Sequence, residues 1–376
     1  MQHLKQTPLP VPRRHPLQAR RHQRGMTLIE WMVSITIGLI LLVGLSALIA
    51  QQSSTQAELE KSSRQIENGR YAMRLLQDDI ELAGYFGEYA GAGELSLPNS
   101  LPNPCLVAAT ALTNALPFPI QGYDSPGASL PAAFSDCPLN AANHVDGSDI
   151  LVVRRVEPAT VTGLLTIGQP YLQSGLSASG SEFLSVLATA AGTAVDVAVF
   201  NLKKKDGTTT ASLRKYLVHI YFLSPCSVPA NGSTCSAANT DDGGVSVPTL
   251  KRLELLDAGM TTVPLVEGID KMQIDYGFDT TGDGAPDSYA KDAAPFAAWD
   301  PATVADPKPI AHWGNVMTVR IHLLARNNER SGGYQDTKTY NLGLDGTTAA
   351  SNDGFKRRVF SQLVRVVNIS SRRDGS

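Results

Sequence analysis

The sequence predicts an α+β protein in which one long N-terminal helix lies across a mostly antiparallel β-sheet. Three observations predict this fold class. Residues 31–50 contain neither a charged residue nor a proline. The next segment repeats apolar residues at helical spacing. The second half of the chain holds several short runs rich in β-branched residues, bounded by turn residues.

The apolar run is long enough to cross a lipid bilayer, which takes about 20 apolar residues in a helix. We therefore expect residues 26–50 to form a transmembrane helix, although Gly38 and Gly44 each weaken a helix by roughly 1 kcal/mol. Glu30 stands at the front of this run. A carboxylate there is costly in lipid and needs a partner.

Residues 1–25 precede the helix and have the composition of a leader rather than of a folded segment. They contain four prolines and six basic residues, with no acidic residue. Their positive charge predicts that they stay cytoplasmic and that the C-terminal bulk lies across the membrane. The length of this leader leaves the true start codon open. The basic residues are Lys5, Arg13, Arg14, Arg20, Arg21 and Arg24.

Residues 51–87 are predicted to continue the helix with an apolar face on one side only. Gly84 and Gly87 are expected to end it. This half should pack on the globular domain formed by residues 88–376. The predicted apolar stripe consists of Leu59, Ile66, Met73, Leu76, Ile80 and Ala83.

Residues 88–148 are rich in Pro, Gly, Ala, Ser and Asn, and are expected to form a long surface insert with little regular structure. Strands are predicted beyond it, and one of them, 272–278, alternates apolar residues with polar ones that should face solvent. Residues 370–376 should form a frayed polar end. The predicted strands are 150–156, 161–167, 194–200, 213–223, 250–256, 272–278, 316–324 and 359–369.

Four cysteines, an even number in a chain predicted to be exported, indicate disulfides. Three pairings are possible, and we favour Cys105 with Cys137 and Cys226 with Cys235 because these pairs close the shortest loops. None has the CxxC spacing of a redox or zinc site.

Charge argues against nucleic acid as the main partner. The whole chain has 32 basic and 35 acidic residues, and removing the six basic residues of the leader leaves 26 against 35, a net charge near −9. Residues 203–205 are three lysines that we interpret as a solvated hairpin tip, with a small basic patch for a partner or DNA as the alternative.

One loop has the character of a metal site. Residues 279–287 place oxygen donors at positions 1, 3, 5 and 9 of an EF-hand-like loop, namely Asp279, Thr281, Asp283 and Asp287. Position 12 is Ala290, so the usual bidentate glutamate is missing, and a simple hairpin turn is the alternative. No cofactor is required otherwise.

No catalytic motif is present. The sequence contains no HExxH, P-loop or GxSxG pattern, and its histidines after the leader, His144, His219, His312 and His322, are scattered. We therefore do not expect an enzyme.

The junction Arg24-Gly25-Met26-Thr27-Leu28-Ile29-Glu30, with the apolar helix behind it, resembles the processing site of type IV prepilins. The resemblance implies cleavage between Gly25 and Met26, N-methylation of Met26, and a pairing of the Glu30 carboxylate with the N-terminal amine of its own or an adjacent subunit. It also implies a pilin-like fold. An ordinary signal anchor that carries one glutamate is the alternative.

Residues 65–72 and 79–85 are similar to those of PilW-type minor pilins. That resemblance implies a non-catalytic subunit that primes type IV pilus assembly and enters the filament near its tip. Its partners would be other minor and major pilins, the prepilin peptidase, the inner-membrane assembly machinery and a PilY-type tip adhesin. It would start as a single-pass inner-membrane protein with a periplasmic domain.

Two other functions stay open at this point. One is a minor pseudopilin of a type II secretion system, and the other, of a different class, is a membrane-anchored enzyme or calcium-dependent binding module. DNA capture by the pilus is a third possibility, which the acidic charge disfavours. The sequence does not say whether the filament serves twitching motility, adhesion or secretion.

Overall fold

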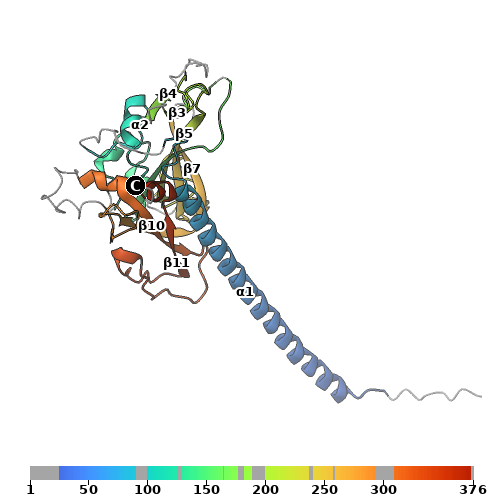
Figure 1. The fold of residues 1–376 in the computed structure, drawn as a ribbon. Helices are drawn as coiled ribbons and strands as arrows, with labels where there is room; N and C mark the ends of the chain where they lie inside the picture. The colour runs from blue at the N-terminus through green and yellow to red at the C-terminus, as the bar shows by residue number, and fades with distance from the viewer. Residues whose placement is uncertain are drawn as a thin grey trace, which may run out of the picture. The chain divides into compact units, whose positions relative to one another are not determined.

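A computed structural model describes residues 25–89, 100–124, 129–163, 165–176, 182–188, 200–236, 240–256, 259–292 and 309–373 (Figure 1). The chain divides into two compact units, residues 1–57 and residues 58–376, which are described separately below. Residues 1–24 of the predicted leader and most of the predicted strand 194–200 lie outside the described part.

The first unit contains the start of helix α1 (Leu28–Glu81), which has 54 residues in all. Every residue from 25 to 57 is exposed, including the large apolar side chains. An 18-residue window of this helix has a mean hydropathy of 2.6, so by length and composition it is able to cross a membrane. This confirms the long apolar N-terminal helix.

The second unit begins with the rest of α1, which buries one side of itself. Its buried positions recur with the period of a helix, as expected for a one-sided apolar face. Leu59 was predicted to join this face, but it is 66% exposed and the face begins six residues later, at Gln65. The buried residues of α1 are Gln65, Gly69, Ala72, Met73, Leu76, Asp79 and Ile80.

The helix ends where Gly84 takes a φ of +75°, a conformation that only glycine adopts without strain. The Gly84 N–H then donates to the Arg154 carbonyl at 3.0 Å, so the chain leaves the helix attached to a strand. This agrees with the predicted termination.

A seven-stranded antiparallel sheet forms one half of the domain. Its strands run in the order β1, β2, β5, β3, β4, and β6 pairs with β5 on one side and with β7 on the other. The strands are β1 (Ile120–Tyr123), β2 (Ile150–Val156), β3 (Pro170–Leu176), β4 (Glu182–Ala188), β5 (Leu213–Ser224), β6 (Thr249–Leu256) and β7 (Gly259–Glu267).

A four-stranded antiparallel sheet forms the other half, in the order β11, β10, β8, β9. The largest core joins α1 to both sheets, and it contains Met73 and Leu76 of α1, Leu151 and Tyr221 of the first sheet and Ile321 of the second. The α+β architecture with antiparallel sheets is thus confirmed. The strands are β8 (Ile269–Phe278), β9 (Ser288–Ala290), β10 (Val316–Arg326) and β11 (Arg357–Arg365).

Residues 100–124 correct the expectation of a long surface insert without regular structure. They form helix α2 (Ala109–Ala115) and strand β1, and Leu116, Phe118 and Ile120 are buried. The side chain of Arg154, almost fully buried in β2, donates to the Phe118 carbonyl and to Gln121 at 2.8 Å each. This arginine ties the segment to the sheet and lies far from it in sequence.

One strand prediction was wrong, and another was right except for its C-terminal end. Within residues 161–167 the described residues form a loop, with the Val161 N–H bonded to the Leu213 carbonyl at 2.8 Å. The predicted strand 359–369 ends at Arg365 and is followed by helix α3 (Val367–Arg373), which also replaces most of the expected frayed end. Ile369 and Ser370 are buried there, so tertiary packing stabilises this short helix.

The polar face of β8 was predicted to lie in water, but Gln273 and Asp275 are almost fully buried. Neighbouring loops cover that face and supply hydrogen bonds. Gln273 donates to the Gly147 carbonyl at 2.6 Å, and Asp275 accepts from the Leu344 N–H at 3.2 Å. The alternation of polar and apolar residues predicts that the two faces of the strand differ. Whether the polar face is exposed to solvent depends on the loops that pack on it.

Both disulfides of the favoured pairing are present, Cys105–Cys137 and Cys226–Cys235. The second closes a loop that Asp241 and Asp242 organise. Asp241 accepts from the Ala230 and Ser236 N–H groups at 2.7 and 2.6 Å, and Asp242 accepts from the Ser227 and Val228 N–H groups at 3.0 and 2.6 Å.

The α1 residue Asp79 holds the helix to the seven-stranded sheet through charge. Its carboxylate is buried and accepts from Arg155 at 2.5 Å and from Tyr221 at 2.9 Å, and it lies 2.8 Å from His219 Nδ1. Burial would raise the pKa of Asp79, but His219 and Arg155 lower it to about 2.

We expect Asp79→Asn to destabilise the head domain by about 3 kcal/mol at pH 7, because the half-buried Arg155 loses its counter-charge. The wild-type carboxylate stabilises the fold above its unfolded pKa of 3.8, and that contribution, about 2 kcal/mol, is lost as pH falls toward 2. Urea unfolding of the full chain in detergent at pH 7 and pH 3 measures both effects. Equal stability differences at the two pH values would contradict this role.

Candidate functional site

The predicted cleavage site lies just before α1. Gly25 and Met26 precede the first helical residue, Leu28, and both are exposed. Among the described residues other than its neighbour in the chain, none has an atom within 4 Å of the position of a Cβ on Gly25. The junction is therefore open on the described side, as a peptidase that must reach the backbone requires.

Thr27 and Glu30 form a reciprocal capping box at the start of α1. The Glu30 carboxylate accepts from the Thr27 N–H at 3.2 Å, and the Thr27 hydroxyl accepts from the Glu30 N–H at 3.3 Å. Each side chain thus satisfies a backbone donor that has no partner within the helix. The spacing Thr-x-x-Glu is a sequence signal for such a cap, and our reading of the sequence missed it.

This arrangement gives Glu30 a local task besides the intersubunit pairing that the prepilin resemblance implies. One oxygen, Oε2, makes all the capping contacts recorded for the carboxylate. Because a carboxylate has two oxygens with several lone pairs, capping leaves capacity for an ammonium partner. The two tasks can be separated by mutation, since a glutamine keeps the cap but not the charge.

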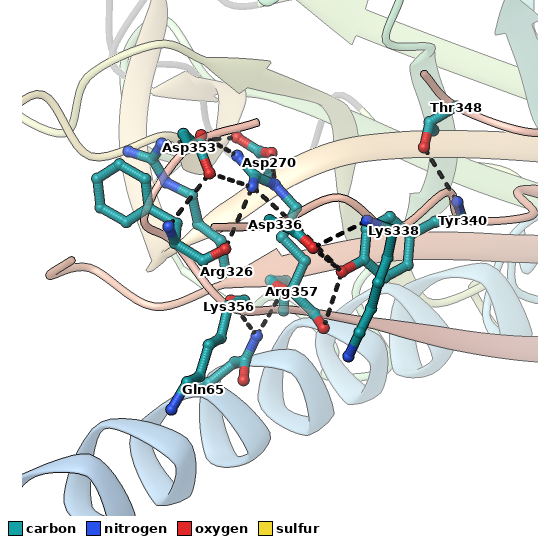
Figure 2. Close-up of polar contacts among 12 residues, drawn as sticks. Gln65, Asp270, Arg326, Asp336, Lys338, Tyr340, Thr348, Asp353, Lys356 and Arg357 are labelled. Atoms are coloured by element: carbon teal, nitrogen blue, oxygen red, sulfur yellow. Dashed lines mark hydrogen bonds and ion pairs between the residues drawn. The ribbon is translucent and has the colours of Figure 1, made fainter. Parts of the chain in front are cut away.

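In the head domain, Arg357 at the start of β11 is the centre of a charged network (Figure 2). Its guanidinium meets Asp353 through two contacts of 2.7 Å, Asp270 at 2.7 Å and Asp336 at 3.1 Å. Burial opposes the charge, but these three carboxylates raise the pKa of Arg357 above its ordinary value. A single buried cation thereby joins three separate segments.

The network organises the long connection between β10 and β11, residues 327–356. Asp336 is fully buried and also accepts from Tyr334 at 3.1 Å and Tyr340 at 3.0 Å. Loops of this length are uncommon unless they are functional. The connection is thus held in one shape by its own charges.

The same region is attached to α1. Figure 2 shows Gln65 on the helix directed at the strands, where its amide donates to the Ala325 carbonyl at 2.7 Å and the Lys356 carbonyl at 2.9 Å. About two turns earlier, Glu58 accepts from Ser331 and Lys356 at 2.6 Å each. Polar contacts therefore tie segment 58–65 of α1 to the connection between β10 and β11. Farther along the helix, Met73 and Leu76 pack in the apolar core.

Two strand histidines are packed as expected. His219 contacts Asp79, and His322 lies between Ser361, 2.8 Å from Nδ1, and Asp275, 3.3 Å from Nε2. The row Ser361, His322, Asp275 has the residue types of a hydrolase triad. However, a Cβ on Gly343 would lie 2.4 Å from His322 Nε2, so the neighbouring loop is packed tightly against this pair. We interpret the row as a cross-strand link.

The other two histidines are also buried. Burial lowers the pKa of both His144 and His312, which disfavours their charged forms. The structure does not bring the four histidines together.

The 279–287 loop uses its carboxylates to bind its own backbone. Asp279 accepts from the Gly282 and Gly284 N–H groups at 2.5 and 3.0 Å, and Asp287 accepts from the Thr280 N–H at 2.7 Å. Asp283 accepts from the Ala285 N–H at 2.9 Å.

Among the described residues, the acidic side chains of this loop do not form a group of three with ligand atoms within 4.8 Å of one another. The one such group is Cys226, Cys235 and Asp241, whose sulfurs form a disulfide. Calcium binding by Asp279, Thr281, Asp283 and Asp287 stays a prediction.

Residues 203–210 form the hairpin that the lysine run predicts. Lys203 bridges to Thr210 across it, and the Gly207 N–H closes the turn on the Lys204 carbonyl at 2.8 Å. Lys204 also pairs with Glu88 at 3.0 Å. The Lys203 ammonium donates to the Thr210 hydroxyl at 3.0 Å, so two of the three lysines have a side-chain partner.

Two family models match the chain. Residues 20–46 match the prokaryotic N-terminal methylation motif. Residues 237–368 match the model described as type IV pilus-assembly protein W, which spans β6 to the start of α3 and includes the Arg357 network. No curated protein and no solved structure was found to match the chain.

These matches confirm the resemblance to prepilins and to PilW-type proteins, and they support a type IV pilus-related minor pilin. They suggest a structural, non-catalytic subunit that interacts with other pilins and pilus machinery. Together with the apolar helix, the methylation motif suggests an anchor in the inner membrane.

We expect Arg357→Leu to destabilise the head domain by about 3–5 kcal/mol, because Asp336 and Asp353 lose a buried partner. The connection 327–356 should also become sensitive to limited proteolysis. Arg358→Leu is the matched control, since Arg358 is adjacent and exposed. Urea unfolding and proteolysis of the full chain measure both effects, and similar behaviour of the two variants would count against the network.

Proposed function

We propose that this chain is a non-catalytic minor pilin that helps to start assembly of a type IV pilus and then occupies a position near the filament tip. The observation that carries the proposal is the occurrence of both motifs in one chain. A methylation motif at 20–46 precedes a helix able to cross a membrane, and a PilW-type segment occupies 237–368.

The N-terminal half of α1 supports an anchor that later becomes a filament contact. Its side chains are exposed from residue 25 to 57, and they are apolar on all sides between Trp31 and Ala50. Such a surface needs either lipid or other helices around it. Removal of the leader after Gly25 would leave the positive Met26 amine four residues from Glu30.

The head domain supports a structural task. Side chains that could serve in chemistry are engaged in holding the fold, as Asp79 and His219 attach α1 to β5, and Asp275 and His322 link β8 to β10. Burial keeps these groups away from a solute. A subunit built in this way presents a rigid surface to other subunits.

The proposed route begins in the inner membrane with a single-pass protein whose C-terminal domain is periplasmic. The prepilin peptidase would then act at Gly25, and the inner-membrane assembly machinery would pass the subunit into the filament. Other minor and major pilins, together with a PilY-type tip adhesin, are the partners that PilW-type membership implies.

The first test is N-terminal peptide mass spectrometry of the membrane protein from cells with and without the prepilin peptidase. We expect a chain that starts at Met26, carries one N-methyl group and requires the peptidase. An intact leader, or a cut beyond the apolar run, would overturn the proposal. A deletion strain then distinguishes a pilus from a type II secretion system, because only the corresponding process should fail.

The second test separates the charge of Glu30 from its capping role. Glu30→Gln keeps an acceptor for the Thr27 N–H but loses the charge, whereas Thr27→Ala loses the hydroxyl of the cap and keeps the charge. If charge pairing governs assembly, the ratio of filament to membrane protein should fall about tenfold for Glu30→Gln, since an unpaired amine stays in an apolar bundle.

Thr27→Ala should assemble within about twofold of wild type, because the loss of one exposed cap costs about 1 kcal/mol or less of helix stability. Immunoblots of sheared filaments and of membranes supply the ratio. Normal incorporation of Glu30→Gln, or an equal loss in both variants, would contradict charge pairing.

A further inference from the structure

Strand β11 forms an open edge of the four-stranded sheet. It pairs with β10 along all of its nine residues, and among the strands that the structure describes it has no partner on its other side. An unpaired strand edge presents backbone donors and acceptors to any extended chain that approaches it. Such edges are the sites at which peptides are added to sheets.

An open groove of about 460 Å³ lies beside this edge, within the head domain. We call it the β11 groove. Met73, which is buried, and Phe360, which is half-buried, supply its apolar lining. Its walls are Arg70, Met73, Arg74, Gln77 and Asp78 of α1 and residues 360–362 of β11. One hydrogen bond joins the two walls, from the Gln362 amide to the Gln77 side-chain oxygen at 2.6 Å, and a bound strand would have to displace it or lie beside it.

The charge of the groove is opposite to that of the chain as a whole. Arg70 and Arg74 line it and are exposed, and Arg358 is exposed beside it, over the Phe360 ring at 5.8 Å. The single carboxylate in the lining is Asp78, 4.0 Å from Arg74 in a pair that is largely solvated. An ion pair this exposed is weak, so Arg74 can exchange Asp78 for the carboxylate of a bound partner.

Charged side chains also protect strand edges from unwanted pairing, and Arg358 alone could serve that purpose. Arg70 and Arg74 are different because they belong to α1 and face the groove from the opposite wall. A protective charge does not need a groove beside it, whereas a bound strand needs room for the side chains on one of its faces.

We propose that the β11 groove binds an extended acidic segment of another pilus subunit, added as an antiparallel or parallel strand to the free edge of β11. Backbone hydrogen bonds to β11 hold the segment, and every second side chain points into the groove. Carboxylates at those positions meet Arg70, Arg74 and Arg358, while their methylene groups lie on the apolar lining. That the partner is a pilus subunit rests on the proposed function.

The test uses the full chain in detergent and a fluorescent nine-residue peptide of alternating Glu and Val, which matches the length of β11. Two further peptides replace every Glu by Gln, or place a proline at the centre. We expect saturable binding of the acidic peptide, measured by anisotropy. Binding of the Gln peptide should be about tenfold weaker, the effect of two exposed ion pairs, and the proline peptide should not bind.

Variants of the protein complete the design. The double variant Arg70→Glu, Arg74→Glu should lose affinity for the acidic peptide. The loss should be at least as large as the difference in affinity between the acidic and Gln peptides for the wild-type protein. Arg64→Glu is the matched control, because Arg64 is an exposed arginine on the same helix that pairs with Glu60 at 2.9 Å and does not line the groove. If the charge-reversed double variant does not fold, the double variant Arg70→Gln, Arg74→Gln, which removes the two charges without reversing them, takes its place.

Hydrogen exchange of residues 357–365 should slow when the acidic peptide is bound. The proposal is overturned if the acidic and Gln peptides bind alike, if the proline peptide binds, or if the Arg64 variant loses as much affinity as the Arg70 and Arg74 variants. These binding results do not depend on processing at Gly25. A protein that binds the peptide but retains its leader would refute the pilus function and leave the groove intact as a binding site.

Discussion

The packing of one side of α1 against the sheets is the constraint on which the rest of the head domain depends. The helix is a single element, yet from Glu58 onward it must present a face that is apolar in the middle and polar at both ends. Met73 and Leu76 provide the middle, Gln65 one end and Asp79 the other. This face packs in one core with apolar residues of both sheets.

The polar ends give the packing a defined register. Asp79 meets Arg155 of β2 and His219 of β5, and Gln65 meets carbonyls of β10 and of the segment before β11. Apolar side chains tolerate small shifts along a helix, whereas directed hydrogen bonds to buried partners do not. Charge and amide groups thus place the helix, and the apolar residues between them supply most of the free energy of its packing.

Arg357 fixes the position of the long connection between β10 and β11 in the same way, through directed polar contacts. Residues 327–356 contain one short 3₁₀ turn, Gly343–Asp345, and no strand. The chain keeps this connection in place with three aspartates around one buried guanidinium rather than with a disulfide. The PilW-type match covers this network, β10 and β11. The edge at which we propose strand addition therefore begins at a residue that three aspartates hold in place.

By itself the sequence determined the features that depend on local pattern: the apolar run, the helical period behind it, most strands, and the junction at Gly25 and Glu30. Strand 150–156 coincides with β2 because its β-branched residues are buried on both faces. Hydrophobic spacing and capping act over a few residues, so they can be read from the chain. The Thr27–Glu30 cap was equally local and was overlooked.

Only the tertiary structure decided which polar residues are buried and what they meet. Asp79 meets Arg155 across 76 residues and Gln65 meets Lys356 across 291, so no local pattern could predict either contact. The same holds for the buried polar face of β8, which distant loops cover, and for helix α3, which forms where a strand was expected. Long-range partners set the burial of each group, and burial determines whether a charge anchors the fold or faces water.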